Sequence, residues 1–425
     1  MGKIAIVNGV RTPFVKARDA FDDLPAHQLG ALCVTELLQR TQLEGRLVDE
    51  VILGCVGQPA EAANVARVAS LLAGLPPEKK AYTVGRNCAS GFEAVTSAAE
   101  KIRCGIDDVV IAGGTESMSN MPLLFNKEAS ALFLKLSKSK TLLGRLQIFA
   151  QMRPRHFVPR SSLMLGLIDP VCGLNMGQTA EMLAKDFGIS REEQDRFALE
   201  SHLRAEASQQ KLREETMDVL IPQGHKGCVR DDDGVRKNQT YEMLKELRPI
   251  FEKRTGTITA GNASQVTDGA CALLLMTEEK AKGLGFEVLG YLRDYLYVGL
   301  EPERMGLGPA FAIEQILKKN AMTLKDIDLF EINEAFAAQV LACLRALSSA
   351  EFSKKYFKSG VPVGVIPWDQ LNVNGGAIAL GHPVGASGAR LVLTCLKEMK
   401  RRSCRRGLVT ACVGGGQGAA LILER

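Results

Sequence analysis

A cysteine among small residues is the first group in this sequence that could act as a nucleophile. Cys88 lies within Arg86-Asn87-Cys88-Ala89-Ser90-Gly91, where an apolar run ends and an alanine-rich helical pattern begins. A thiol at the start of a helix faces unpaired N–H groups and the positive end of the helix dipole, which both favour the thiolate. The motif therefore predicts nucleophilic catalysis through Cys88, although a cysteine that is simply packed would suit the same neighbours.

Three further residues could complete a reaction site around this thiol. His382 is one of only five histidines, lies between Gly381 and Pro383, and is of the type that most often acts as a general base. Cys412 follows an apolar run and precedes Gly414-Gly415-Gly416, whose successive N–H groups could bind an anion. Asn333 ends another apolar run, where it could cap a helix or point into a site.

The elements that would position these residues occur twice. Short β-branched runs alternate with longer helical periods, a pattern typical of an α/β fold. In each half a short strand leads to a reactive residue, a helix of small residues, an apolar strand and then glycines, with Cys88 and His382 in equivalent places. An internal duplication about a pseudo-twofold axis would bring both to one central site. The predicted spans are 81–84, 89–102 and 108–112 in the first half, and 371–373, 386–400 and 407–411 in the second.

The character of the chain changes at two places between these halves. From about residue 121 Pro, Met and basic residues appear, and long charged helical patterns follow up to about residue 254. Strand-like runs return at 257–260 and 270–276. We therefore expect an N-terminal half from residues 1–120 plus 255–280, an inserted loop domain at 121–254, and a C-terminal half at 281–425.

Composition excludes several classes of protein. The 425 residues, 46% hydrophobic and 24% charged, fit a folded chain of two or three domains. The net charge of +5 is concentrated between residues 123 and 160, where eight basic residues face one acid, unlike the broad footprint of a nucleic-acid-binding protein. The eleven cysteines are too sparse in 425 residues for a disulfide-rich protein, and none forms a C-x-x-C motif. They predict reduced thiols and no structural zinc site.

Six segments together resemble motifs of the thiolase family, and they occur in that family's order along almost the whole chain. They are NCASGFEAV, GGTESMSNMP, GNASQVTDGA, NEAFAAQ, NVNGGAIALGHPVGASGAR and CVGGGQGAALILE. The resemblance implies a thiolase fold, which is a duplicated five-layer α-β-α-β-α arrangement with an inserted loop domain. The repeat described above supports this fold independently.

The resemblance also implies catalytic roles. Cys88 would be the nucleophile that becomes acylated, and His382 would take its proton. Cys412 would be the second acid and base, because a thiol is matched to a thioester enolate better than a carboxylic acid is. His382 and a water held by Asn333 would bind the enolate oxygen, and the backbone N–H groups of Cys88 and Gly414 would bind the tetrahedral oxyanion.

The same resemblance implies how the substrate is held. Ser264, with Ala260 and Gly261, matches the segment that lines the pantetheine arm of coenzyme A. Coenzyme A would be a co-substrate, with no permanently bound cofactor and no metal. We therefore expect a 3-ketoacyl-CoA thiolase of fatty-acid β-oxidation, which cleaves 3-ketoacyl-CoA with CoA through an acyl-Cys88 thioester.

Other members of this fold remain alternatives. An acetyl-CoA C-acetyltransferase would use the same residues for condensation, but short-chain enzymes tend to carry His where this chain has Asn175. The basic insertion resembles the β subunits of trifunctional fatty-acid oxidation complexes, although those usually read His-Glu-Ala-Phe-Ala where Asn333 begins the motif here. A non-catalytic lipid-binding protein of this fold and a ketoacyl synthase are the further alternatives.

The basic insertion has its own interpretation. Leucines recur at helical spacing over 132–150 with lysines and an arginine between them, which predicts a basic amphipathic helix. Such a helix could contact an anionic membrane, dock a partner such as the α subunit of a β-oxidation complex, or pack on its own domain. We also expect a homodimer or homotetramer and a cytoplasmic, bacterial-type location, because the sequence has neither a signal-peptide pattern nor a long apolar segment.

Overall fold

A large mixed sheet dominates the computed structural model, which describes residues 2–221 and 227–425. The ten-stranded sheet runs in the order β12-β13-β14-β11-β1-β10-β5-β3-β4, and β2 pairs with β10. Residues 222–226, within the predicted loop domain, lie outside the described part. The strands of this sheet are β1 (Ile4–Arg11), β2 (Val15–Lys16), β3 (Glu50–Gly54), β4 (Lys80–Val84), β5 (Val109–Glu116), β10 (Thr267–Thr277), β11 (Gly290–Gly299), β12 (Leu329–Ile332), β13 (Arg406–Val413) and β14 (Gln417–Glu424).

The two ends of the sheet repeat one pairing pattern. From β4 inward, the pairs β4–β3 and β3–β5 are parallel, and the pairs β5–β10 and β10–β1 are antiparallel. From the other end, the Leu371–Phe330 bridge and the β12–β13 pair are parallel, and β13–β14 and β14–β11 are antiparallel. The halves join where β1 meets β11. The predicted duplication is therefore present, but the expected strand at 371–373 is reduced to one bridge because Asn372 is left-handed (φ 44°).

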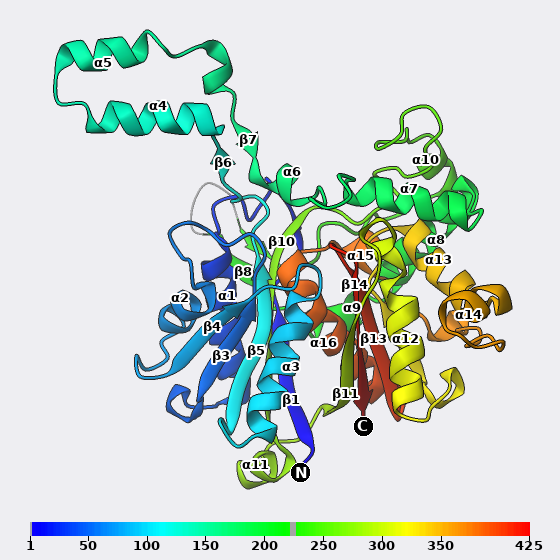
Figure 1. Cartoon of the computed structure of the whole chain (residues 1–425). Helices are drawn as coiled ribbons and strands as arrows, with labels where there is room; N and C mark the ends of the chain where they lie inside the picture. Colours follow the sequence, from blue (N-terminus) through cyan, green and yellow to red (C-terminus); the bar gives the residue numbers. More distant parts are fainter. Residues whose placement is uncertain (1, 222–226) are drawn as a thin grey trace. The chain divides into compact units, whose positions relative to one another are not determined.

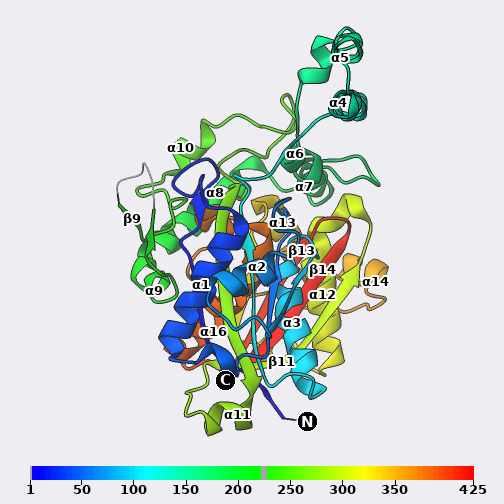
Figure 2. The ribbon, with the colours of Figure 1, turned by 90° about the vertical axis from the view of Figure 1, so that its left-hand side faces the viewer.

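Two helices of small residues form the central layer of the fold (Figure 1). α3 (Ser90–Arg103) and α16 (Val384–Arg402) pack on each other, and both contact β5. Their small residues permit a close crossing, since a Cβ on Gly91 would lie 2.6 Å from the backbone nitrogen of Ala389. α1 and α2 cover the outer face of the first half, where they face the viewer in Figure 2, and α12 covers that of the second half. This gives the five α-β-α-β-α layers.

One segment predicted as a strand is irregular, and further helices surround the sheet. Glu181 accepts the N–H groups of Thr257 and Ile258, so the run at 257–260 is irregular instead of the expected strand. The helices are α1 (Ala26–Thr41), α2 (Val65–Leu72), α7 (Met176–Asp186), α8 (Arg191–Ala207), α9 (Gln209–Arg213), α10 (Tyr241–Lys245), α11 (Glu278–Gly283), α12 (Gly308–Lys319), α13 (Ala337–Ser348), α14 (Ala350–Tyr356) and α15 (Ala377–Leu380); β8 (Val219–Leu220) and β9 (Cys228–Val229) form a small separate sheet.

Residues 121–168 form a second compact unit. The predicted amphipathic helix is two helices here, because the chain turns at residues 139–141 and Thr141 caps the second helix. Phe133 packs against Phe125 and Phe157, with ring centroids 5.1 and 6.3 Å apart, and Ala129 is the buried residue of the first helix. The elements are β6 (Leu123–Leu124), α4 (Lys127–Lys138), α5 (Leu142–Phe149), β7 (Arg160–Ser161) and α6 (Ser162–Gly166).

This two-unit division keeps residues 169–254 with the rest of the chain. The three-part domain organisation predicted from the sequence remains a prediction. Among the residues that the structure describes, no helix combines the length and the apolar character needed to cross a bilayer.

Candidate active site

Cys88 lies at the turn between β4 and α3, where the predicted nucleophile was expected. Asn87 holds a left-handed conformation (φ 42°), and Ser90 Oγ accepts the N–H of Arg86 at 2.8 Å, which fixes the turn. Burial raises the pKa of the Cys88 thiol, while the N–H groups of Gly414 and of Cys88 itself act on the sulfur in the opposite direction. Desolvation therefore outweighs the donors that the sequence argument relied on, and the thiol needs a base to become a nucleophile.

Cys412 lies near the end of β13, beside the same turn. Gly415 (φ 92°) and Gly416 (φ 81°) allow the chain to reverse into β14, as only glycine does readily. Asn87 Nδ2 donates to the carbonyl oxygen of Gly414 at 2.7 Å. This bond joins the turn at residues 86–90, called the nucleophile turn below, to the turn at residues 414–416, called the glycine turn. Burial raises the pKa of Cys412 well above its usual value, and the neighbouring Cys88 and Cys343 add to the effect. Cys412 is therefore a protonated thiol that could give up a proton.

His382 lies between α15 and α16, in the second half, and contacts Asn333. Its Nε2 is 3.4 Å from Asn333 Nδ2, and its backbone N–H donates to the carbonyl oxygen of Gln265 at 3.2 Å. Burial, with a smaller contribution from the Arg390 cation, lowers the pKa of His382 to about 4. The imidazole is therefore neutral at pH 7 and can accept a proton.

Asn333 and the predicted coenzyme A segment run side by side. The side chain of Asn333 is fully buried, and its Oδ1 has no hydrogen-bond partner among the described residues. Ser264 N donates to the carbonyl oxygen of Ala335 at 2.9 Å, which places the segment beside the Asn333 turn. Within that segment Gly261 is buried and Ala260 is exposed. A buried amide oxygen without a partner fits a bound water or a substrate donor.

Two buried glutamates that the sequence reasoning missed hold these turns together. Glu116, at the end of β5, accepts the N–H groups of Val56 (3.1 Å), Gly57 (2.7 Å) and Gly385 (2.8 Å), so it links both halves behind the cluster. Glu334 accepts from Ser201 Oγ (2.6 Å), Asn372 Nδ2 (2.8 Å) and the N–H of Ile378 (3.2 Å). Both lie in the thiolase-like motifs, and the signal that could have found them is a carboxylate within a few residues of the end of an apolar strand.

Comparison with known proteins gives the family. The family model "Thiolase, N-terminal domain" matches residues 4–279, and "Thiolase, C-terminal domain" matches residues 286–425. The chain belongs to the thiolase family. It is 41% identical to the 3-ketoacyl-CoA thiolase of Pseudoalteromonas translucida over 99% of this chain and 97% of that protein.

Solved thiolase structures share the whole fold. The acetyl-CoA acetyltransferase of Bacillus anthracis is 36% identical, with a TM-score of 0.86 over 100% of this chain and 99% of that one. Human mitochondrial 3-ketoacyl-CoA thiolase in complex with CoA is 34% identical, with a TM-score of 0.85 over 100% and 98%. The predicted thiolase fold is confirmed.

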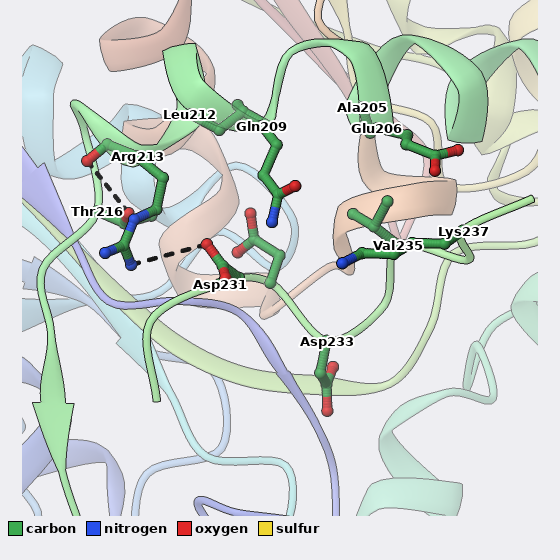
Figure 3. A pocket seen from close by; sticks show the side chains of 11 residues that line it. Ala205, Glu206, Gln209, Leu212, Arg213, Thr216, Asp231, Asp233, Val235 and Lys237 are labelled. Carbon is green, nitrogen blue, oxygen red and sulfur yellow. Dashed lines mark hydrogen bonds and ion pairs between the residues drawn. The ribbon is translucent and has the colours of Figure 1, made fainter. Parts of the chain in front are cut away.

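A cavity of about 280 Å³ in this thiolase has none of the predicted catalytic residues in its lining, and Figure 3 shows the side chains that do line it. Two of its four acids already have partners, because Asp232 pairs with Arg11 at 2.6 Å and Asp233 accepts the N–H of Lys16. Among the residues that line it are Ala205, Glu206, Gln209, Leu212, Arg213, Thr216, Asp231, Val235 and Lys237. In the described ranges no three His, Cys, Asp or Glu side chains are grouped as a metal site would require.

Proposed function

We propose that this protein is a 3-ketoacyl-CoA thiolase, an acyltransferase that cleaves 3-ketoacyl-CoA with coenzyme A into acetyl-CoA and an acyl-CoA two carbons shorter. The observation that carries the proposal is the junction at Gly414. Its N–H points at Cys88 Sγ, its carbonyl accepts from Asn87, and Cys412 is two residues away. A nucleophile, an oxyanion donor and an acid therefore meet at one place.

In the first half-reaction the proton of Cys88 passes to His382 as the sulfur attacks the 3-keto carbon. The N–H groups of Cys88 and Gly414 stabilise the oxyanion, and loss of one such donor typically costs about 3 kcal/mol in the barrier. The C2–C3 bond then breaks, leaving the acyl group on Cys88. The acetyl-CoA carbanion receives the proton of Cys412 at C2, while His382 and a water held by Asn333 stabilise the enolate oxygen.

In the second half-reaction coenzyme A enters with its thiol. The Cys412 thiolate takes that proton, and the coenzyme A sulfur attacks the thioester carbon. Cys88 leaves as thiolate and regains its proton from His382. Ser264, Ala260 and Gly261 line the pantetheine arm in this proposal, and no metal or permanently bound cofactor takes part.

The test is CoA-dependent thiolysis of acetoacetyl-CoA and 3-ketohexadecanoyl-CoA by the wild type, Cys88→Ala and Cys412→Ala. We expect cleavage by the wild type, no acyl-enzyme with Cys88→Ala, and transfer of an acyl group from acyl-CoA to Cys88 in Cys412→Ala without turnover. Absence of cleavage by folded wild type would contradict the proposal and favour a thiolase fold kept for lipid binding.

The second candidate is an acetyl-CoA C-acetyltransferase, and the likeness to the Bacillus anthracis enzyme favours it. The same cluster would run in the direction of condensation. Cleavage of acetoacetyl-CoA alone would support this candidate, whereas faster cleavage of 3-ketohexadecanoyl-CoA would support β-oxidation.

We also propose that the enzyme is a homodimer or homotetramer and that it accepts the α subunit of a β-oxidation complex. β4 is the last strand at one end of the sheet, and Tyr82 on it is half-buried beside the Lys101 ammonium. A half-buried edge strand with an aromatic side chain suits pairing with a second copy. Light scattering of the purified chain at several concentrations tests this, and a strictly monomeric mass would contradict it.

Finally, we propose that residues 121–168 contact an anionic membrane surface, with the rest of the enzyme in the cytoplasm. Leu142 and Leu143 are 76% and 68% exposed on α5, and basic residues flank them. Exposed leucines among cations suit insertion between anionic headgroups. We expect co-sedimentation with phosphatidylglycerol vesicles, weakened by salt and by replacing both leucines with serine. The matched control replaces the exposed Val361 and Val365 with serine, and equal sedimentation of both variants would contradict the proposal.

A further inference from the structure

Ser387 contacts the ring nitrogen of His382 that does not face Asn333. Its Oγ lies 2.6 Å from His382 Nδ1, and it also donates to the carbonyl oxygen of Pro383 at 3.0 Å. Ser387 is 1% exposed and lies in the first turns of α16, the central helix. Its position is therefore fixed by the most buried part of the fold.

The single hydrogen of the Ser387 hydroxyl determines which tautomer the His382 imidazole adopts. A serine hydroxyl has one hydrogen and two acceptor lone pairs. Because the hydrogen is donated to Pro383, the oxygen can only accept at the other contact, so Nδ1 must carry the hydrogen. A neutral imidazole has a single N–H, which leaves Nε2 with a free lone pair. The contact at Nε2 agrees with this, since Asn333 presents Nδ2, a donor, at 3.4 Å.

We infer that Ser387 is a positioning residue that holds His382 in the tautomer with hydrogen on Nδ1, so that Nε2 is free to take the proton of Cys88. The inference rests on the proposed function, because it concerns the base of that reaction. It also explains why a serine is buried here, at the start of a helix whose neighbouring residues are valine, glycine and alanine. Without the hydroxyl, the buried Nδ1–H loses its acceptor, and this tautomer loses part of its advantage over the one in which a hydrogen blocks Nε2.

The kinetic test compares Ser387→Ala, Ser387→Thr and Ser70→Ala. Ser70 is the matched control, since it is a buried helical serine that donates to its own helix at Arg67, away from the cluster. We expect Ser387→Ala to lower kcat for thiolysis by about tenfold to a hundredfold, the loss typical when the partner that orients a metal-bound histidine is removed. KM should change little, Ser387→Thr should retain most of the activity, and Ser70→Ala should equal the wild type.

Two further measurements report on the tautomer without needing turnover. Two-bond proton–nitrogen spectra of histidine-labelled protein, with His382 assigned by His382→Gln, should show Nδ1 protonated in the wild type and a changed state in Ser387→Ala. The rate at which iodoacetamide alkylates Cys88, followed by peptide mass spectrometry between pH 6 and 9, should fall in Ser387→Ala and its rise should move to higher pH. Thermal unfolding of each variant identifies any that does not fold.

The outcomes separate this inference from the proposed function. A proton on Nε2 in the wild type, or equal alkylation profiles in the wild type and Ser387→Ala, would overturn the inference even if thiolysis is rapid. A wild type that does not cleave 3-ketoacyl-CoA, yet shows Nδ1–H and slower alkylation in the alanine variant, would contradict the proposed function and support the role of Ser387.

Discussion

The carbonyl oxygen of Gly385 occupies the place where residue 114 would have a side chain. A Cβ built on Gly114 lies 1.9 Å from that oxygen and 2.6 Å from the carbonyl carbon, both backbone atoms. Gly114 is in β5 of the first half, and Gly385 follows His382 in the second. The absence of one side chain therefore sets how close the turn that carries His382 can come to the half that carries Cys88.

Gly114→Ala should accordingly disturb the site and the fold together. Neither backbone can yield without moving β5 or the start of α16, so the cost should exceed the usual overpacking penalty of about 1–3 kcal/mol. We expect a clear fall in the unfolding midpoint and loss of thiolysis. Gly299→Ala is the control, because nothing lies within 4 Å of its added Cβ. Equal denaturation midpoints for the two variants would contradict the close approach.

Glu116→Gln should impair the site while keeping the side chain's shape. One carboxylate oxygen faces the N–H groups of Val56 and Gly385, and the other faces that of Gly57. An amide replaces one of these acceptors with a donor, which leaves buried N–H groups unpaired at roughly 1–3 kcal/mol each. We expect lower stability in urea and slower thiolysis, because the turns at Gly57 and Gly385 lose their shared acceptor. The control is Glu36→Gln. Glu36 is half-buried at the surface, where it pairs with Arg40 four residues later in the same helix, and this variant should behave as the wild type.

The sequence predicts the chemistry of this molecule better than the scaffolding around it. Cys88, His382 and Cys412 can be singled out because reactive side chains stand among glycines and alanines, and the duplicated pattern predicts that they share one site. The partners of Glu116 cannot be found this way, since Gly385 lies 269 residues away and contributes only a backbone N–H. The run at 257–260 is misjudged for a related reason: a distant carboxylate, Glu181, takes the N–H groups that a strand would use.

Asn87→Ala should uncouple the nucleophile turn from the glycine turn. Its Nδ2 holds the Gly414 carbonyl at 2.7 Å, and its left-handed backbone suits asparagine better than alanine. The variant loses a part-buried hydrogen bond and adds backbone strain of order 1 kcal/mol. We expect kcat to fall because the Gly414 N–H, which we propose stabilises the oxyanion, is no longer held in its direction toward Cys88. Asn87→Gly relieves the backbone strain but still lacks the side-chain hydrogen bond. Full activity in the glycine variant would therefore show that the hydrogen bond has no role.

His202 should make the protein less stable as the pH falls below neutrality. Burial and the nearby Arg236 and Lys16 cations lower its pKa in the folded state to about 4, from 6.5. Between these values the unfolded chain binds a proton that the folded one does not, so stability is lost as the pH drops through this window. From pH 7 to pH 5 the loss attributable to His202 is about 2 kcal/mol.

Urea unfolding at several pH values isolates this contribution when the wild type is compared with His202→Asn. The asparagine Oδ1 can accept the N–H of Arg236, which His202 Nδ1 accepts at 3.3 Å, and it does not titrate. His382, with the same direction of shift, is present in both proteins and cancels in the difference. The stability gap should therefore move in favour of the variant as the pH falls from 7 to 5. A gap that stays constant over this range would mean that the folded-state pKa of His202 is not lowered.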